Sequence, residues 1–259
     1  MFMRASSILL VVAGLAVGNG SHAAESSAPV PVLIELFTSE GCSSCPPADA
    51  WLQQMDAVQP IPGTQLIVLS EHVDYWNHDG WKDPFSSPSI TERQSDYVRA
   101  LRLDSPFTPQ VIVGGNLNLH LNDPQQISNT LQQAAMGKAV PVRILSVKVD
   151  DGTQASLQAH IEVDGNFAPH NADIFGAVAL NHAESQVLHG ENSGKHLLHT
   201  AVLQSLTKIG KLEKGKTFSR DITIKLKPGT DPKNLRLVVF AQEAGPGKVL
   251  GAALQEVHQ

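Results

Sequence analysis

The chain has 259 residues, and its 25 acidic side chains outnumber its 19 Lys and Arg side chains, which gives a formal net charge of −6 at pH 7. A mildly acidic chain without a basic run lacks the electrostatic signature of nucleic-acid binding, so we expect no nucleic-acid partner. The length is sufficient for one large domain or two ordinary ones.

The first residues have the pattern of an export signal. Arg4 supplies a positive start, residues 8–17 form an apolar core, and residues 21–23 offer a small-x-small cleavage site. An apolar run of about ten residues is too short for a membrane-spanning helix, which needs about 20. We therefore expect a signal peptide over residues 1–23, a periplasmic or secreted mature protein, and no stable membrane insertion after cleavage. An uncleaved membrane anchor is the alternative.

The first predicted strand, residues 32–37, is apolar and β-prone apart from Glu35. A buried carboxylate costs free energy unless it is paired or protonated. Two interpretations of Glu35 are therefore open. It either exchanges a proton with the cysteine pair that follows, or it is a strand carboxylate that is paired with a base or faces water.

The only two cysteines, Cys42 and Cys45, follow this strand and precede a predicted helix. A C-x-x-C pair in that position is the reacting unit of thiol–disulfide chemistry. So short a loop gains little stability from a structural disulfide, and a structural zinc site would lack its other ligands. We expect Cys42 to be the more exposed, nucleophilic cysteine and Cys45 to resolve the mixed disulfide. No positive side chain lies between them, so the sequence does not fix the redox direction.

Apolar residues at helical spacing predict a helix directly after the cysteines, with two prolines in its first turn, over residues 46–58. A second buried strand follows at residues 65–70 and leads into a polar and aromatic loop. The side chains predicted to shape a substrate groove beside the cysteines are His72, Asp74, Trp76 and Trp81. A copper(I) site formed by the thiolates and a histidine is the competing interpretation of this loop. We expect no metal and no cofactor in this protein.

A further helical pattern begins near Pro88, Thr108 and Pro109 precede a third strand at residues 111–113, and Asp123 caps a last helix. This order of strands, helices and proline resembles thioredoxin-like proteins, in which a cis proline at this place packs against the active-site disulfide. The resemblance implies that Pro109 is cis and acts with the cysteines, and that the Thr108 backbone pairs with an extended substrate. An ordinary trans proline is the alternative.

Four longer phrases resemble one exported bacterial family, domain-of-unknown-function family 1223. They lie at residues 35–49, 72–76, 80–84 and 108–110. The resemblance implies a thioredoxin-like fold and an exported protein, and it supplies no substrate.

From Pro141 the pattern changes to short alternating strands separated by Gly, Asp and Pro, at residues 142–149, 155–163, 174–180, 218–226, 235–240 and 249–255. These strands predict an immunoglobulin-like β sandwich. Residues 199–209 fit a strand or a short helix. Four histidines of this half lack ligand spacing and are expected on the surface or in loops: His182, His189, His196 and His199.

The expected architecture is an α/β thioredoxin-like domain over residues 30–138 followed by an all-β immunoglobulin-like sandwich over residues 141–259. The expected function is thiol–disulfide exchange by Cys42 and Cys45 with an exported redox partner protein or a small disulfide. The alternative is a binding or copper-handling module with an inert disulfide, because such scaffolds also serve recognition.

Overall fold

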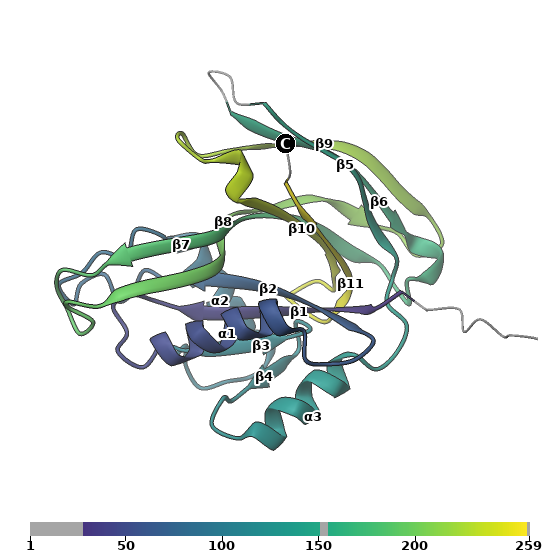
Figure 1. The fold of residues 1–259 in the computed structure, drawn as a ribbon. Helices are drawn as coiled ribbons and strands as arrows, with labels where there is room; N and C mark the ends of the chain where they lie inside the picture. The colour runs from purple at the N-terminus through teal and green to yellow at the C-terminus, as the bar shows by residue number, and fades with distance from the viewer. Residues whose placement is uncertain (1–27, 151–154, 258–259) are drawn as a thin grey trace, which may run out of the picture.

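The computed structural model describes residues 28–150 and 155–257 (Figure 1). The predicted signal peptide lies outside the described residues. In the first half the elements are β1 (Val30–Thr38), α1 (Pro46–Val58), β2 (Thr64–His72), α2 (Pro88–Ala100), β3 (Gln110–Val113), β4 (Leu117–Leu119) and α3 (Pro124–Ala134). The second half contains β5 (Val142–Asp150), β6 (Ser156–Asp164), β7 (Ala172–Gln186), β8 (His196–Leu212), β9 (Thr217–Lys225), β10 (Leu235–Gln242) and β11 (Val249–Glu256).

Eight of these strands form one mixed sheet in the order β11-β10-β7-β8-β2-β1-β3-β4. Strands β1 and β2 are parallel, and β8 joins the free edge of β2 where Ser70 pairs with Val202. Strands β5, β6 and β9 form a second, antiparallel sheet. An apolar core joins that second sheet to β7, β10 and β11 of the first. The upper part of Figure 1 shows the second sheet beside β10 and β11.

The expected fold class, a thioredoxin-like domain followed by a separate immunoglobulin-like sandwich, is wrong. The large sheet contains strands from both halves of the chain. One buried core also joins Leu33 and Phe37 to Val238 and Phe240. The reason is the long β7–β8 hairpin, whose strands have 15 and 17 residues and reach the edge of β2. The segment left open between strand and helix, residues 199–209, lies within β8.

The three predicted helices are present, and they cover opposite faces of the β1–β2–β3 part of the sheet. Helices α1 and α3 pack with the even-numbered residues of β1, whereas α2 packs with the odd-numbered ones. Successive side chains of a strand point to opposite faces. Glu35 therefore lies on the α2 face, while the cysteines are joined to α1, the helix on the other face.

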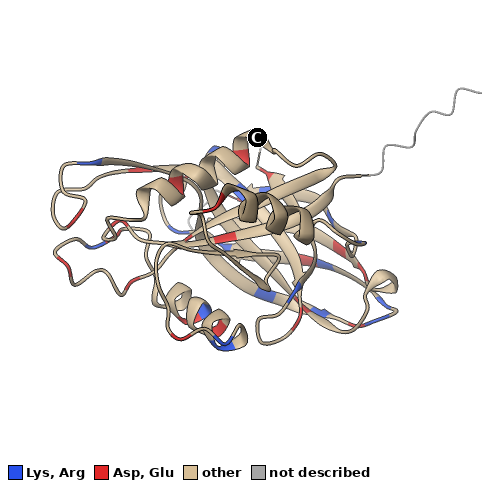
Figure 2. Cartoon of the chain, turned by 90° about the horizontal axis from the view of Figure 1, so that it is seen from below, with Lys and Arg blue, Asp and Glu red and all other residues tan. Residues whose placement is uncertain are grey.

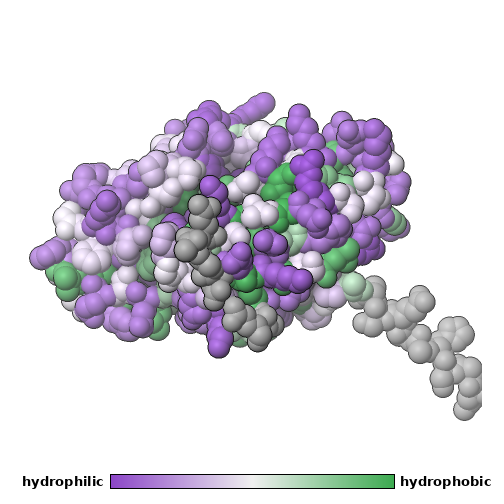
Figure 3. All heavy atoms as spheres, turned by 90° about the horizontal axis from the view of Figure 1, so that it is seen from above, coloured by the Kyte–Doolittle hydropathy of each residue, from purple (hydrophilic) through white to green (hydrophobic). Residues whose placement is uncertain are grey.

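The surface has no large region of one character in the views drawn. Figure 2 shows Lys and Arg interspersed with Asp and Glu along the chain. Figure 3 shows apolar atoms in small areas separated by polar ones. Among the described residues, the helices are too short or too polar to cross a membrane.

Candidate disulfide site

Cys42 and Cys45 form a disulfide in the turn between β1 and α1, with their Cα atoms 5.4 Å apart. The amide of Cys42 donates to the Ser39 carbonyl, and the amide of Cys45 donates to the Cys42 carbonyl, both at 3.2 Å. Cys45 is also the N-cap residue of α1. Both cysteines are buried, with exposed fractions of 1% for Cys42 and 0% for Cys45, so the two hardly differ in exposure.

The tip of the β7–β8 hairpin, residues 187–195, contacts this turn, and we call it the cap loop (Figure 1, left). The side-chain amide of Asn192 donates to the carbonyls of Glu40, at 2.8 Å, and Cys42, at 2.9 Å. The amide of Ser43 donates to the Glu191 carboxylate at 3.0 Å. Asn192 and Cys42 are 150 residues apart in the chain, so the two halves build this site together.

Beneath the turn lies a group of buried polar side chains, the α1-face cluster: Glu40, Asp49, His72, Asp83 and His199. The His72 imidazole lies 2.7 Å from Asp83, which also accepts the amide of Glu40 at 2.9 Å. Burial alone would raise the pKa of Asp83, but the neighbouring His72 imidazole and the amides of Glu40 and Phe85 together hold that pKa below its usual value. The His199 imidazole lies 3.1 Å from the Glu40 carboxylate.

Asp49 is the member of the α1-face cluster that lies on α1, the helix that Cys45 caps. It follows Cys45 by one helical turn, and its amide donates to the Cys45 carbonyl at 3.1 Å. Residues four apart on a helix lie on the same face. One Asp49 carboxylate oxygen has no hydrogen-bond partner in residues 28–150 and 155–257, and the other lies 3.9 Å from His199. Burial raises the pKa of Asp49 to about 7, although the charge of His199 acts in the opposite direction.

Three of the predicted groove residues lie around the cysteine turn. The Trp81 indole donates to the Glu40 carboxylate at 2.7 Å. Trp76 packs so closely on the turn that a Cβ atom on Gly41 would lie 3.0 Å from the Trp76 Cβ. The Trp76 indole donates to the Thr108 hydroxyl at 2.8 Å, and the Thr108–Pro109 peptide bond is cis, as predicted.

The other two predicted groove residues have different surroundings. Asp74 accepts the Thr91 hydroxyl of α2 at 2.6 Å, so it contacts the helix on the opposite face from α1. His72 is fully buried and belongs to the α1-face cluster instead of lining a surface groove.

Glu35 belongs to a second buried group, the α2-face cluster: Glu35, Glu71, Arg93, Tyr97 and Gln242. Arg93 donates to one Glu35 oxygen at 2.7 Å, and the Tyr97 hydroxyl donates to the other at 2.5 Å. This geometry matches the interpretation of Glu35 as a carboxylate paired with a base. Within the part of the chain that the structure describes, both oxygens of Glu71 lack hydrogen-bond partners. Burial together with the charge of Glu35 raises the pKa of Glu71 well above its usual value.

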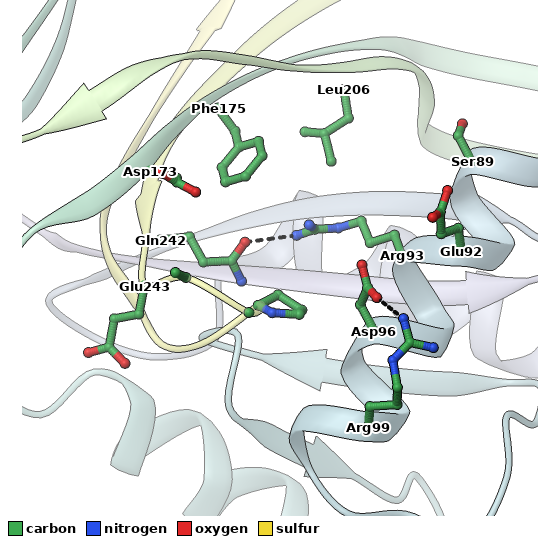
Figure 4. Close-up of a pocket in the computed structure, with 13 residues that line it drawn as sticks. Ser89, Glu92, Arg93, Asp96, Arg99, Asp173, Phe175, Leu206, Gln242 and Glu243 are labelled. Atoms are coloured by element: carbon green, nitrogen blue, oxygen red, sulfur yellow. Dashed lines mark hydrogen bonds and ion pairs between the residues drawn. The ribbon is translucent and has the colours of Figure 1, made fainter.

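A cavity of about 370 Å³ opens beside the α2-face cluster (Figure 4). Phe175 and Leu206 form its apolar wall, Arg93 reaches toward Gln242 across its floor, and Asp96 pairs with Arg99 at its rim. Neither cysteine lines this cavity, so it is separate from the disulfide site.

Sequence reasoning missed Asp49, His199, Glu191 and Asn192. The signal for Asp49 was available, because residues 45, 49 and 52 fall on one helical face. His199 was expected on the surface or in a loop, but it is 3% exposed. Local sequence carries no signal for His199, Glu191 or Asn192, because each contacts residues about 150 positions away. Within residues 28–150 and 155–257, no group of three or more His, Cys, Asp or Glu side chains is arranged to hold a metal ion.

Comparison with known proteins gives the family. No curated protein matches the chain. A crystal structure of a structural-genomics target from Agrobacterium tumefaciens is 26% identical, covers 90% of this chain and 97% of its own, and superposes with a TM-score of 0.68. HBP35 of Porphyromonas gingivalis, at 17% identity and a TM-score of 0.62 over 89% of this chain and 76% of its own, shares the fold. Residues 33–242 match the family described as a protein of unknown function, DUF1223, and the chain therefore belongs to that family.

Proposed function

We propose that this protein is an exported thiol–disulfide oxidoreductase whose reacting group is the Cys42–Cys45 disulfide. The observation that carries the proposal is Asp49, a buried carboxyl with a pKa of about 7 that lies one helical turn after Cys45. An acid with that pKa holds or releases a proton near neutral pH, which suits general acid–base chemistry. The substrate is a dithiol or disulfide of another exported protein or of a small molecule.

The exchange begins when a substrate thiolate attacks the Cys42 sulfur and forms a mixed disulfide. The Cys42–Cys45 bond breaks, and its electron pair goes to the Cys45 sulfur. The start of α1 favours this negative sulfur, and Asp49 in its acid form donates a proton to it. A second substrate thiolate then attacks the mixed disulfide, which releases Cys42 as a thiolate and the substrate as a disulfide. In the reverse direction Asp49 accepts the proton.

A second candidate function is a binding module with an inert disulfide. The burial of both sulfurs favours it, because a buried disulfide resists attack. The two functions differ in the reduction potential of the cysteine pair. A redox enzyme of this kind is expected to lie between about −120 and −270 mV, whereas an inert disulfide lies below about −300 mV.

The deciding experiment combines this potential with trapping. Incubation of the reduced protein with oxidised glutathione should form a glutathione adduct that accumulates in Cys45→Ser, which keeps Cys42 but cannot resolve the adduct. The matched variant Cys42→Ser should form little adduct. A potential below about −300 mV together with no adduct on Cys45→Ser would establish the inert disulfide instead.

A further inference from the structure

The cap loop is an ordered structure with its own hydrogen bonds. The Val187 amide donates to the Lys195 carbonyl at 3.0 Å, and the Gly194 amide donates back to the Val187 carbonyl at 2.8 Å. Lys195 donates to the side-chain oxygen of Asn192 at 2.8 Å. The loop therefore presents Asn192 to the cysteine turn in one fixed orientation.

The side-chain nitrogen of Asn192 uses both of its hydrogen-bond donors. A side-chain amide has two N–H donors, and here they serve the carbonyls of Glu40 and Cys42. Because Asn192 itself is fully buried, the carbonyls around the first cysteine are closed off by a residue of the other half of the chain.

Two further contacts hold the cap loop against the same site. Glu191 accepts the amide of Ser43, between the two cysteines. Gly190 lies against the loop after β2, where a Cβ atom at this position would be 3.1 Å from the Asp79 carbonyl and 3.3 Å from the Trp81 Cβ. The Gly190 φ of +79° also favours glycine. The cap loop thus touches the cysteine turn and one of its aromatic neighbours together.

We propose that the cap loop is a gate whose opening controls access to the disulfide, with Asn192 as its main tether and Glu191 as a weaker one. Disulfide exchange requires a thiolate to reach a sulfur atom, and Cys42 is 1% exposed while the cap loop is docked. The biological role of this gate rests on the proposed function. A redox partner would have to displace the cap loop, or bind after the loop has opened, before exchange. Access itself is measurable whether or not the protein is an oxidoreductase.

The test measures reduction of the oxidised protein by tris(2-carboxyethyl)phosphine, which acts irreversibly and so does not depend on the reduction potential. Its phosphorus attacks a sulfur, the S–S bond breaks, and water supplies the oxygen of the phosphine oxide and the protons of two thiols. We expect Asn192→Ala to be reduced about tenfold faster than the wild type, because it loses both donor contacts to the turn. The matched control Asn166→Ala should keep the wild-type rate, since Asn166 forms its hydrogen bonds with Asp164 in its own turn, away from the cysteines.

A second variant keeps the test decisive if Asn192→Ala fails to fold. Glu191→Ala removes an exposed side chain that contacts the turn through Ser43, and we expect reduction about two to three times faster. Wild-type rates in whichever of these variants folds, as judged by thermal melting, would overturn the gate. Faster reduction without any glutathione adduct on Cys45→Ser would uphold the gate and reject the oxidoreductase.

Discussion

The two faces of the β1–β2 sheet bury carboxyl groups in different ways. On the α2 face, Glu35 has a guanidinium partner in Arg93 and a hydroxyl donor in Tyr97. On the α1 face, Asp49 has no Lys or Arg partner among the described residues, and burial raises its pKa to about 7. The two buried carboxyl groups therefore differ in their partners. Arg93 and Tyr97 together satisfy both oxygens of Glu35, whereas burial near a histidine alone leaves Asp49 with a pKa at which a proton can move near neutral pH.

The sequences of the two helices explain this difference. Helix α2 places Arg93 on its buried face, whereas α1, from Pro46 to Val58, contains no basic residue. The nearest base to Asp49 is His199, which β8 supplies from the other half of the chain. The comparison predicts that removing Arg93 from the α2 face lowers the stability of the protein. Removing the Asp49 carboxyl from the α1 face should raise the stability above pH 7.

The largest expected effect is on the α2 face. Arg93→Met should lower the free energy of unfolding by about 3–5 kcal/mol, because it leaves Glu35 and Glu71 buried without a cation. Urea unfolding at pH 7 measures this loss. The matched control is Arg99→Met on the same helix, which breaks an exposed pair with Asp96 and should cost no more than about 0.5 kcal/mol. Equal losses in the two variants would show that the buried ion pair contributes no more to the free energy of unfolding than the exposed pair.

The next effect is the pH dependence of stability on the α1 face. Because the folded pKa of Asp49, about 7, exceeds its ordinary value of 3.8, folding holds the proton more tightly. The contribution of Asp49 to stability is therefore complete below pH 3.8 and is lost as the pH rises through 7. Asp49→Asn removes this loss, so we expect the variant to be more stable than the wild type by about 2–4 kcal/mol at pH 8 and nearly equal to it at pH 4.

Urea unfolding of the oxidised proteins at both pH values checks this prediction. The same stability difference at pH 4 and pH 8 would mean that Asp49 does not change its protonation state between them.

The sequence predicted what depends on neighbours in the chain. Pro46 and the apolar spacing that follows it predicted α1, and Asp123 predicted the start of α3, where its side chain accepts two amides. The alternating side-chain directions of a strand could also have placed Glu35 on one face of β1 together with Leu33 and Phe37. What the strand alone could not reveal is which helix covers that face, because helix placement depends on the whole sheet.

The sequence could not predict what depends on distant parts of the chain. Strand β8 joins β2 through Ser70 and Val202, and this pairing links the two expected domains through one large sheet. No local pattern in either strand specifies the other as its neighbour. The contacts of the cap loop could not be predicted for the same reason. Asn192 donates to two carbonyls of the cysteine turn, but the C-x-x-C motif can be recognised in the sequence without Asn192.

The smallest expected effect is on the rate of disulfide exchange, which should depend on Asp49 and not on Glu35. Asp49→Asn should slow exchange with oxidised glutathione at pH 7 by about tenfold, because the Cys45 thiol loses its proton acceptor. The inflection of the wild-type rate near pH 7 should disappear in the same variant, which a loss of packing alone would not cause. Glu35→Gln should leave the rate and its pH profile unchanged while lowering stability, because Glu35 pairs with Arg93 on the opposite face of the sheet. A slower rate with an altered pH profile in Glu35→Gln and an unchanged rate in Asp49→Asn would reverse the assignment and make the ion-paired carboxylate the proton carrier.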